Sequence, residues 1–295
     1  MKITELFTRK NPVVSFEVFP PKTDSGIETI YQTIDQLIPL KPDYISVTYG
    51  AAGSVKNNKT IELASYIKNK WNVESAAHLT CINSSKEIID QVLAAIKAEN
   101  IENILALRGD IPKDTSAERV NNRDFTYAAD LIKHLKSEHD FAISGACYPE
   151  GHIETKNIDL EVHYLRQKIE AGASHLITQL FFDNVDFFRF LAKARAAGVT
   201  VPIQAGIMPV LNKKQIVRIT ELSGARIPTD LLELMEKYND EPDLLAQAGI
   251  DYAVKQINDL IANGVDGIHI YTMNRPDIAK RIMEQIKPYV QVGEN

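Results

Sequence analysis

The chain has 295 residues, of which 44% are hydrophobic and 24% are charged, and its formal net charge is -6 at pH 7. This composition provides ample material for a buried core, and the length suits either two ordinary domains or one large α/β barrel. The negative charge balance argues against a general nucleic-acid-binding protein, because such proteins are usually basic.

The cysteines and the apolar segments narrow the class of protein further. Cys81 and Cys147 lie far apart without a CxxC pattern, so we predict neither a disulfide framework nor a zinc site, and no other metal site stands out. Residues 1–12 contain no apolar segment typical of a secretion signal, and no apolar run approaches the length of a membrane span. We therefore expect a cytoplasmic protein that binds neither metal, nucleic acid nor membrane.

Short apolar runs rich in β-branched residues recur along the chain and predict strands. In chain order they occupy residues 13–19, 43–49, 73–80, 102–108, 141–147, 174–181, 200–206 and 265–271. Between them, apolar residues recur with the period of an amphipathic helix. The helices are expected at residues 27–38, 58–70, 86–98, 124–138, 158–171, 184–196, 212–222, 229–238, 243–262 and 276–287.

This alternation predicts a parallel sheet whose strands are joined by helices. Eight such units most simply close into a (β/α)8 TIM barrel, whereas a doubly wound open sheet is the alternative. No G-x-G-x-x-G pattern follows any predicted strand, so a Rossmann dinucleotide site has no support. Residues 228–249 resemble an inserted helix pair before the last strand, and residues 1–295 are expected to form a single catalytic barrel domain.

Glu17 is the charged residue of the first predicted strand, VVSFEVF. Successive side chains of a strand point to opposite faces, so Phe16 and Val18 should face the helices. Ser15 and Glu17 should then face the barrel axis. Burial beside apolar neighbours raises the pKa of a carboxyl group, which suits a general acid near neutral pH. From the residues alone, a structural ion pair with Arg108 is an equally open interpretation.

Polar residues collect at the carboxyl ends of the predicted strands, where (β/α)8 barrels carry their active sites. The residues at or just after these ends include Thr48, Tyr49, His78, Thr80, Arg108, Asp110, Tyr148, Glu150, His152, Gln179, Tyr271 and Arg275. Most of them also have a structural explanation, such as rim packing or a loop salt bridge. Gln179 is harder to explain in this way, because an amide among apolar residues needs hydrogen-bond partners. Other histidines are expected at the surface: His134, His139, His163 and His175.

Several segments, taken in order, resemble the bacterial methylenetetrahydrofolate reductases. They are FEVFPPK (16–22), YISVTYGAAGS (44–54), AHLTC (77–81), LALRGD (105–110), YPEGH (148–152), KIEAGASHLITQLFFD (168–183), GIMPV (206–210) and YTMNR (271–275). Each segment alone is weakly specific, but the match runs in register over nearly the whole chain. The length corresponds to the catalytic barrel of that family, without the carboxyl-terminal regulatory domain of eukaryotic relatives.

The resemblance implies an FAD-containing barrel that reduces 5,10-methylenetetrahydrofolate to 5-methyltetrahydrofolate and so supplies methyl groups for methionine synthesis. NADH or NADPH is the implied reducing co-substrate, in ping-pong kinetics: it reduces the flavin and leaves before the folate enters the same pocket. The implied partners are these small molecules and further copies of the chain, since relatives commonly form homo-oligomers. Two other classes stay open, namely a flavin-free reductase on the same barrel and a folate-binding barrel without redox chemistry.

The resemblance also implies roles for individual residues. Glu17 would be the general acid that promotes protonation of folate N10, and Asp110 would stabilise the cationic folate intermediate and tune the flavin. Substrate contacts are implied for Gln179, Gln215 and Arg275. FAD contacts are implied for Thr48, Tyr49, Ala51, His78, Arg108, Gly109, Asp110, Tyr127, Ala128, Tyr148, His152 and Lys168.

The chain departs from the family pattern at three positions. Glu161 stands where Asp is usual, and Gln167 stands where some relatives have a basic residue. Ile219 occupies a place that can be aromatic. These departures concern the contacts to the FAD tail and the stacking over the nicotinamide, and they leave the implied chemistry intact.

Overall fold

Parallel strands form a closed barrel in which each strand pairs with its neighbours in sequence order and β8 closes onto β1. The structure is a computed structural model and describes residues 1–21, 23–49, 58–82, 84–110 and 124–290. The strands are β1 (Val13–Val18), β2 (Tyr44–Val47), β3 (Glu74–Thr80), β4 (Asn103–Leu107), β5 (Ala142–Cys147), β6 (His175–Thr178), β7 (Ile203–Ile207) and β8 (Gly267–Tyr271). The predicted (β/α)8 barrel is confirmed, and the open-sheet alternative is wrong.

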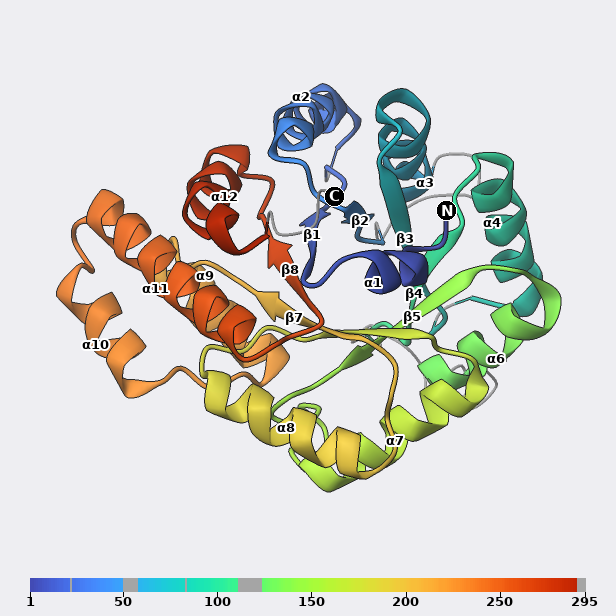
Figure 1. Cartoon of the computed structure of the whole chain (residues 1–295). Coiled ribbons are helices and arrows are strands. Elements are labelled where there is room, and N and C mark those ends of the chain that lie inside the picture. Colours follow the sequence, from blue (N-terminus) through green and yellow to red (C-terminus); the bar gives the residue numbers. More distant parts are fainter. Residues whose placement is uncertain (22, 50–57, 83, 111–123, 291–295) are drawn as a thin grey trace.

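Helices surround the barrel and connect successive strands (Figure 1). They are α1 (Leu6–Arg9), α2 (Ile27–Leu37), α3 (Lys59–Ser65), α4 (Lys86–Ala98), α6 (Ala128–Glu138), α7 (Ile158–Ala171), α8 (Asn184–Ala196), α9 (Lys213–Ser223), α10 (Thr229–Lys237), α11 (Pro242–Ala262) and α12 (Pro276–Val290). Shorter turns occupy Ile3–Glu5, Asp24–Gly26 and Ile38–Leu40, and a π-helical turn at Tyr66–Lys70 continues α3. Side-chain caps begin several helices, such as Ser85 before α4 and Asn157 before α7. Within the described ranges, no helix has both the length and the apolar character needed to cross a membrane.

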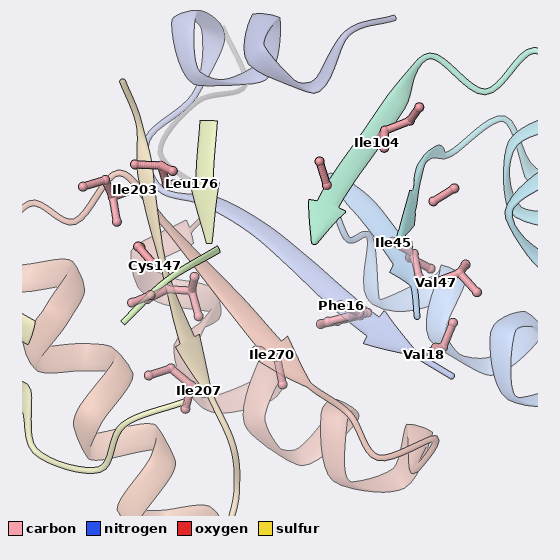
Figure 2. Close-up of a cluster of buried hydrophobic side chains, with 14 of the residues drawn as sticks. Phe16, Val18, Ile45, Val47, Ile104, Cys147, Leu176, Ile203, Ile207 and Ile270 are labelled. Atoms are coloured by element: carbon pink, nitrogen blue, oxygen red, sulfur yellow. The ribbon is translucent and has the colours of Figure 1, made fainter. Parts of the chain in front are cut away.

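The outer face of the strands packs against the helices and forms the main hydrophobic core. Phe16 and Val18 of β1 are fully buried in it. Phe16 lies in register with Ile45 of β2 and Ile270 of β8, and Figure 2 shows these side chains within one apolar cluster. The outward orientation predicted from strand alternation is therefore confirmed.

The inner face of the strands is unusually polar for a barrel of this type. Such interiors are mostly filled by Val, Ile and Leu, whereas here Ser15, Tyr44, Gln204 and His269 have no exposed surface. Ser15 faces inward as predicted, and its Oγ lies 2.7 Å from His269 Nδ1. The interior is thus held together by hydrogen bonds as well as by packing.

His175 is also buried inside the barrel, and its predicted surface position is wrong. It lies on β6 with no exposed surface, and its Nδ1 is 2.8 Å from Ser144 Oγ. The ring of Phe7, on α1, packs against the imidazole with ring centroids 4.8 Å apart. The sequence pattern placed His175 at a junction between a helix and a strand, and it did not predict the short helix α1 that covers this end of the barrel.

The connection from β7 to β8 contains three helices, α9, α10 and α11. By contrast, α7 alone connects β5 to β6, and α8 alone connects β6 to β7. The helix pair predicted at 228–249 corresponds to α10 and the first turns of α11, but α11 continues without a break to Ala262. Figure 1 shows α10 at the outside of the molecule beside α11. Leu231 of α10 and Leu245 of α11 pack in one cluster with Leu180 and Met208, which follow β6 and β7. That the pair is an insertion into the eightfold repeat stays a prediction.

Candidate active site

A cleft of about 820 Å³ opens at the carboxyl ends of the strands. This volume lies within the range of roughly 300–1,000 Å³ that is typical of small-molecule and cofactor sites. The cleft is lined by these predicted site residues: Glu17, Thr48, Tyr49, His78, Arg108, Gly109, Asp110, Tyr148, His152 and Gln179. The structure therefore brings most of the predicted residues together, and their individual roles stay predictions.

Three predicted FAD contacts lie outside this lining. Lys168, on α7, donates a 2.7 Å hydrogen bond to the carbonyl oxygen of Ala146, which itself lines the cleft. Lys168 therefore stands directly behind the cleft wall. Tyr127 and Ala128 lie at the start of α6, and the side chain of Tyr127 is 61% exposed.

Two predicted substrate contacts also lie outside the lining. Gln215 lies in the first turn of α9, where its backbone N–H donates to the Asn212 side chain. Arg275 follows β8 and donates two hydrogen bonds to Asp277, at 2.9 and 2.8 Å. Ala51 lies outside the described residues.

Glu17 lies at the carboxyl end of β1, with its side chain 17% exposed in the cleft. Its Oε2 lies 3.4 Å from Nε2 of His269 and 3.6 Å from Nε2 of His78. The Thr272 hydroxyl donates a 2.6 Å hydrogen bond to the carbonyl oxygen of Glu17 and holds the end of the strand. The predicted inward orientation is confirmed, and the alternative ion pair with Arg108 is wrong.

The pKa of Glu17 is lowered from its ordinary value, which corrects the prediction of a raised pKa. Burial is the largest single influence and raises it, but the hydrogen bond with His269 and the electrostatic interactions with His78 and His269 together outweigh burial. Burial also lowers the pKa of His78 to about 4, so this imidazole is neutral at neutral pH. The sequence revealed the apolar neighbours of Glu17 along the chain, but not the contacts that His78 of β3 and His269 of β8 make with its carboxylate.

Arg108 follows β4, and its carboxylate partner is Glu154, with N–O distances of 2.9 and 2.7 Å. This two-point contact raises the pKa of Arg108 and lowers that of Glu154. His152 belongs to the same group, with its Nδ1 3.8 Å from Glu154 Oε2, and burial lowers its pKa. This wall of the cleft therefore carries donor groups that suit an anionic ligand.

Gly109 lets the chain turn between Arg108 and Asp110. Its φ is +85°, a conformation that other residues rarely adopt, and an added Cβ would lie 3.0 Å from the Cβ of Thr80. Asp110 is exposed and lines the cleft directly after this turn. The turn thereby places the carboxylate of Asp110 in the cleft wall, where a ligand can reach it.

Gln179 follows β6 directly and lines the cleft. Its backbone N–H donates to the carbonyl oxygen of Cys147 at 2.7 Å, and its side-chain oxygen accepts from the N–H of Leu180 at 2.9 Å. The expectation that this amide needs partners is met for its oxygen. Among the described residues no acceptor is bonded to its side-chain nitrogen, so this donor is available to a ligand.

The departures from the family pattern differ in their relation to the cleft. Glu161 is 2% exposed, burial raises its pKa, and its Oε1 lies 3.9 Å from Lys168 Nζ. Ile219 packs against the apolar cluster that contains Leu180 and Leu231. Gln167 is exposed on the same helix as Glu161 and does not line the cleft. Glu161 is thus the departure that stands beside a predicted FAD contact.

His269 contacts Glu17 but was not among the predicted site residues. A signal was present, because His269 and Tyr271 alternate with Ile268 and Ile270 along β8. Strand alternation therefore puts His269 on the same inner face as the cleft-lining Tyr271. The cleft is also lined by two loop residues that were not predicted, Ile82 and Ser84.

A family model described as "Methylenetetrahydrofolate reductase" matches residues 2–287, which include all strands of the barrel and the whole cleft. The chain belongs to the methylenetetrahydrofolate reductase family. Among similar methylenetetrahydrofolate reductases, a 5,10-methylenetetrahydrofolate reductase from Pectobacterium carotovorum subsp. carotovorum is 37% identical over 280 residues, which are 95% of this chain and 91% of that protein. Methylenetetrahydrofolate reductase (NADH) 1 from Arabidopsis thaliana is 34% identical over 284 residues, which are 92% of this chain and 48% of that protein.

A solved structure shares the fold of this chain at lower sequence similarity. It is an uncharacterized protein from Clostridium thermocellum, described as binding two copies of 5-methyl-5,6,7,8-tetrahydrofolic acid. The TM-score is 0.67 with 15% sequence identity, and the match covers 98% of each chain. At this identity the likeness establishes the fold alone.

Proposed function

We propose that this protein converts 5,10-methylenetetrahydrofolate to 5-methyltetrahydrofolate with NADH or NADPH, in ping-pong kinetics through bound FAD. The observation that carries the proposal is a half-buried carboxylate, Glu17, in a cleft of about 820 Å³ whose walls supply cationic and hydrogen-bond-donating groups. The reaction would take place in the cytoplasm and supply methyl groups for methionine synthesis. We expect the chain to act as a homo-oligomer.

The donor groups of the cleft fit a flavin with a negatively charged diphosphate. Arg108 and His152 lie in its wall, and Lys168 lies behind Ala146. His78 Nε2 is buried there with no hydrogen-bond partner among the described residues, and a buried polar atom is expected to have one. These four side chains would supply charge and donors to the flavin and its diphosphate. When bound, FAD supplies the two-electron carrier that takes hydride from the nicotinamide and passes it to the folate.

Glu17 is the proposed source of the proton that reaches folate N10. Protonation there opens the imidazolidine ring and leaves an iminium at N5, which accepts the hydride. Asp110 would stabilise this cation, and the side-chain N–H of Gln179 would orient the pterin. A pterin in the cleft removes water from Glu17, and this desolvation raises its pKa toward the range of a general acid.

The visible spectrum of the purified protein tests this proposal. We expect a flavin band that NADH bleaches under anaerobic conditions and that 5,10-methylenetetrahydrofolate restores. A colourless protein that still reduces the folate without added FAD would support the flavin-free reductase instead. A protein that stays inactive after FAD is added would support a folate-binding barrel without redox chemistry.

Glu154→Gln is expected to tighten FAD binding, by up to about five-fold. Glu154 occupies two N–H groups of Arg108, at 2.9 and 2.7 Å, so an incoming diphosphate has to share or displace this carboxylate. The Glu154 side chain is 56% exposed, and exposed ion pairs contribute about 0.2–1 kcal/mol, which sets the size of the effect. Quenching of FAD fluorescence during titration of the apoprotein measures Kd directly.

The matched control for this variant is Glu170→Gln. It removes the same charge from the exposed pair between Arg166 and Glu170 on α7, which are 3.7 Å apart and do not line the cleft. Its Kd for FAD should equal that of the unmodified protein. Weaker FAD binding by Glu154→Gln would mean that Glu154 orients Arg108 for the cofactor, and the idea of competition would be refuted.

A further inference from the structure

A chain of buried polar side chains runs through the barrel interior to Glu17. The Tyr44 hydroxyl donates to Gln204 Oε1, and Gln204 Nε2 lies 3.1 Å from Ser15 Oγ. Ser15 Oγ lies 2.7 Å from His269 Nδ1, and His269 Nε2 lies 3.4 Å from Glu17 Oε2. All members except Glu17 have no exposed surface, so these groups bond to one another rather than to bulk water.

The donors and acceptors of these groups favour one direction for this chain of hydrogen bonds. The side-chain oxygen of Gln204 accepts from Tyr44, whose phenol keeps its proton because burial raises its pKa. The NH2 group of Gln204 can only donate, and it faces Ser15 Oγ. Ser15 accepts from Gln204, which leaves its own proton free to point at His269 Nδ1. In this arrangement Nδ1 accepts the hydrogen bond, and the proton of the neutral imidazole lies on Nε2, which faces Glu17.

Backbone groups hold the amide of Gln204 in this orientation independently of Ser15. Gln204 Nε2 also lies 3.2 Å from the carbonyl oxygen of Val13 and 3.3 Å from that of Ile268. A flipped amide would set its oxygen against both carbonyl oxygens. Gly267 provides the space for the side chain, because an added Cβ would lie 2.8 Å from Gln204 Cγ and 2.6 Å from the carbonyl oxygen of Val13.

We propose that Gln204 and Ser15 are positioning residues, which fix the proton of His269 on Nε2 and so aim an N–H donor at the Glu17 carboxylate. This inference rests on the proposed role of Glu17 as the general acid. Neither Gln204 nor Ser15 lines the cleft, so both act through His269. The donor favours the ionised carboxylate and thereby sets how readily Glu17 takes up the proton that it has to deliver.

Three titratable groups near Glu17 do not change charge near neutral pH, namely His78, Tyr44 and Tyr271. Among the described residues, the groups whose charges act on Glu17 are His78 from β3, Tyr44 from β2, and His269 and Tyr271 from β8. Burial raises the pKa of both tyrosines and lowers that of His78 to about 4. The hydrogen bond between His269 and Glu17 is the contact through which Ser15 and Gln204 act on the carboxylate.

Ser15→Ala removes the donor that keeps Nδ1 of His269 unprotonated. With its proton on Nδ1, the imidazole presents a bare Nε2, which accepts a hydrogen bond from protonated Glu17. The pH at which the folate half-reaction declines should then rise by about one to two pH units, because a general acid must be protonated. Stopped-flow measurement of the holoenzyme across pH checks this, and the NADH half-reaction should keep its pH profile.

Ser144→Ala is the matched control. Ser144 Oγ lies 2.8 Å from Nδ1 of the buried His175, so this variant removes an equivalent hydroxyl from the same interior, and neither residue lines the cleft. Its pH profiles should match those of the unmodified protein. Gln204→Met removes the amide at similar volume and should shift the folate profile in the same direction as Ser15→Ala, which keeps the proposal testable if one variant fails to fold.

Nitrogen-15 spectra of the histidine-labelled holoenzyme provide a readout that does not depend on activity. Long-range ¹H–¹⁵N correlations report which ring nitrogen carries the proton, and His269→Gln assigns the signal. We expect the Nε2–H form of His269 in the unmodified protein and in Ser144→Ala, and a substantial Nδ1–H population in Ser15→Ala.

The outcomes separate this inference from the function on which it rests. An Nδ1–H form of His269 in the unmodified protein overturns the positioning role. The positioning role is also overturned if Ser15→Ala leaves the pH profile of the folate half-reaction unchanged while Glu17→Gln abolishes the pH dependence of that half-reaction. If Glu17→Gln itself keeps that pH dependence, the general-acid role fails and the positioning role fails with it. Equal shifts in both half-reactions would indicate a structural effect and would also overturn the proposal.

Discussion

Glu17→Gln should slow the reduction of 5,10-methylenetetrahydrofolate by about two to four orders of magnitude, while flavin reduction by NADH stays near its original rate. Glutamine keeps the volume and polarity of the side chain but has no proton to deliver to N10. The NADH half-reaction needs hydride transfer alone, so it should not depend on this proton. Anaerobic rapid mixing, followed through the flavin absorbance, separates the two half-reactions.

The pH dependence of the folate half-reaction should change with the same substitution. In the unmodified protein this half-reaction should accelerate as pH falls toward the pKa of Glu17, since more of the carboxyl then carries a proton. Glu17→Gln should remove that acceleration. The control is Glu150→Gln, which alters another half-buried carboxyl after β5 that does not line the cleft. Equal losses in both half-reactions of Glu17→Gln would assign Glu17 a structural role.

The alternation of strand and helix patterns was sufficient to predict the barrel, and the alternation of side chains along the first strand was sufficient to predict the face on which Glu17 lies. Phe16 and Val18 point to the helices because period-2 alternation is a local property, which is readable without knowing the neighbouring strands. The helix α1 is different, because it has four residues and its Phe7 is held by His175, far along the chain. Short elements that depend on tertiary contacts of this kind leave little trace in local sequence.

The electrostatic environment of Glu17 could not be predicted because it comes from other strands. His269 is 252 positions away in sequence, yet the register of β1 and β8 pairs Ser15 with His269 and Glu17 with Tyr271. Apolar neighbours along β1 predicted a raised pKa, and the imidazoles across the barrel reversed that direction. Sequence periodicity indicates which face a side chain occupies, whereas pairing register decides which charges it meets there.

The free energy of unfolding should fall by roughly 3–4 kcal/mol between pH 7 and pH 5 because of two buried histidines. Burial lowers the pKa of His78 to about 4 and that of His175 to about 3. In the unfolded chain both should titrate near the ordinary value of about 6.5. At a pH between the folded and the unfolded pKa values, the unfolded chain takes up protons that the folded barrel excludes. The contribution of the two histidines to the free energy of unfolding is therefore fully present above the ordinary pKa and is lost as pH falls below it. Urea unfolding at a series of pH values measures the slope.

His175→Gln should remove about half of this slope, because an amide can keep a hydrogen bond with Ser144 but takes up no proton. His163→Gln, at an exposed position on α7, is the control and should leave the slope unchanged. A slope in His175→Gln equal to that of the unmodified protein would mean that water and protons reach the barrel interior. A halved slope would instead mean that this interior excludes protons at neutral pH. That is the condition under which Ser15 can hold His269 in a single protonation form, since a water molecule at Nδ1 could otherwise replace its hydroxyl.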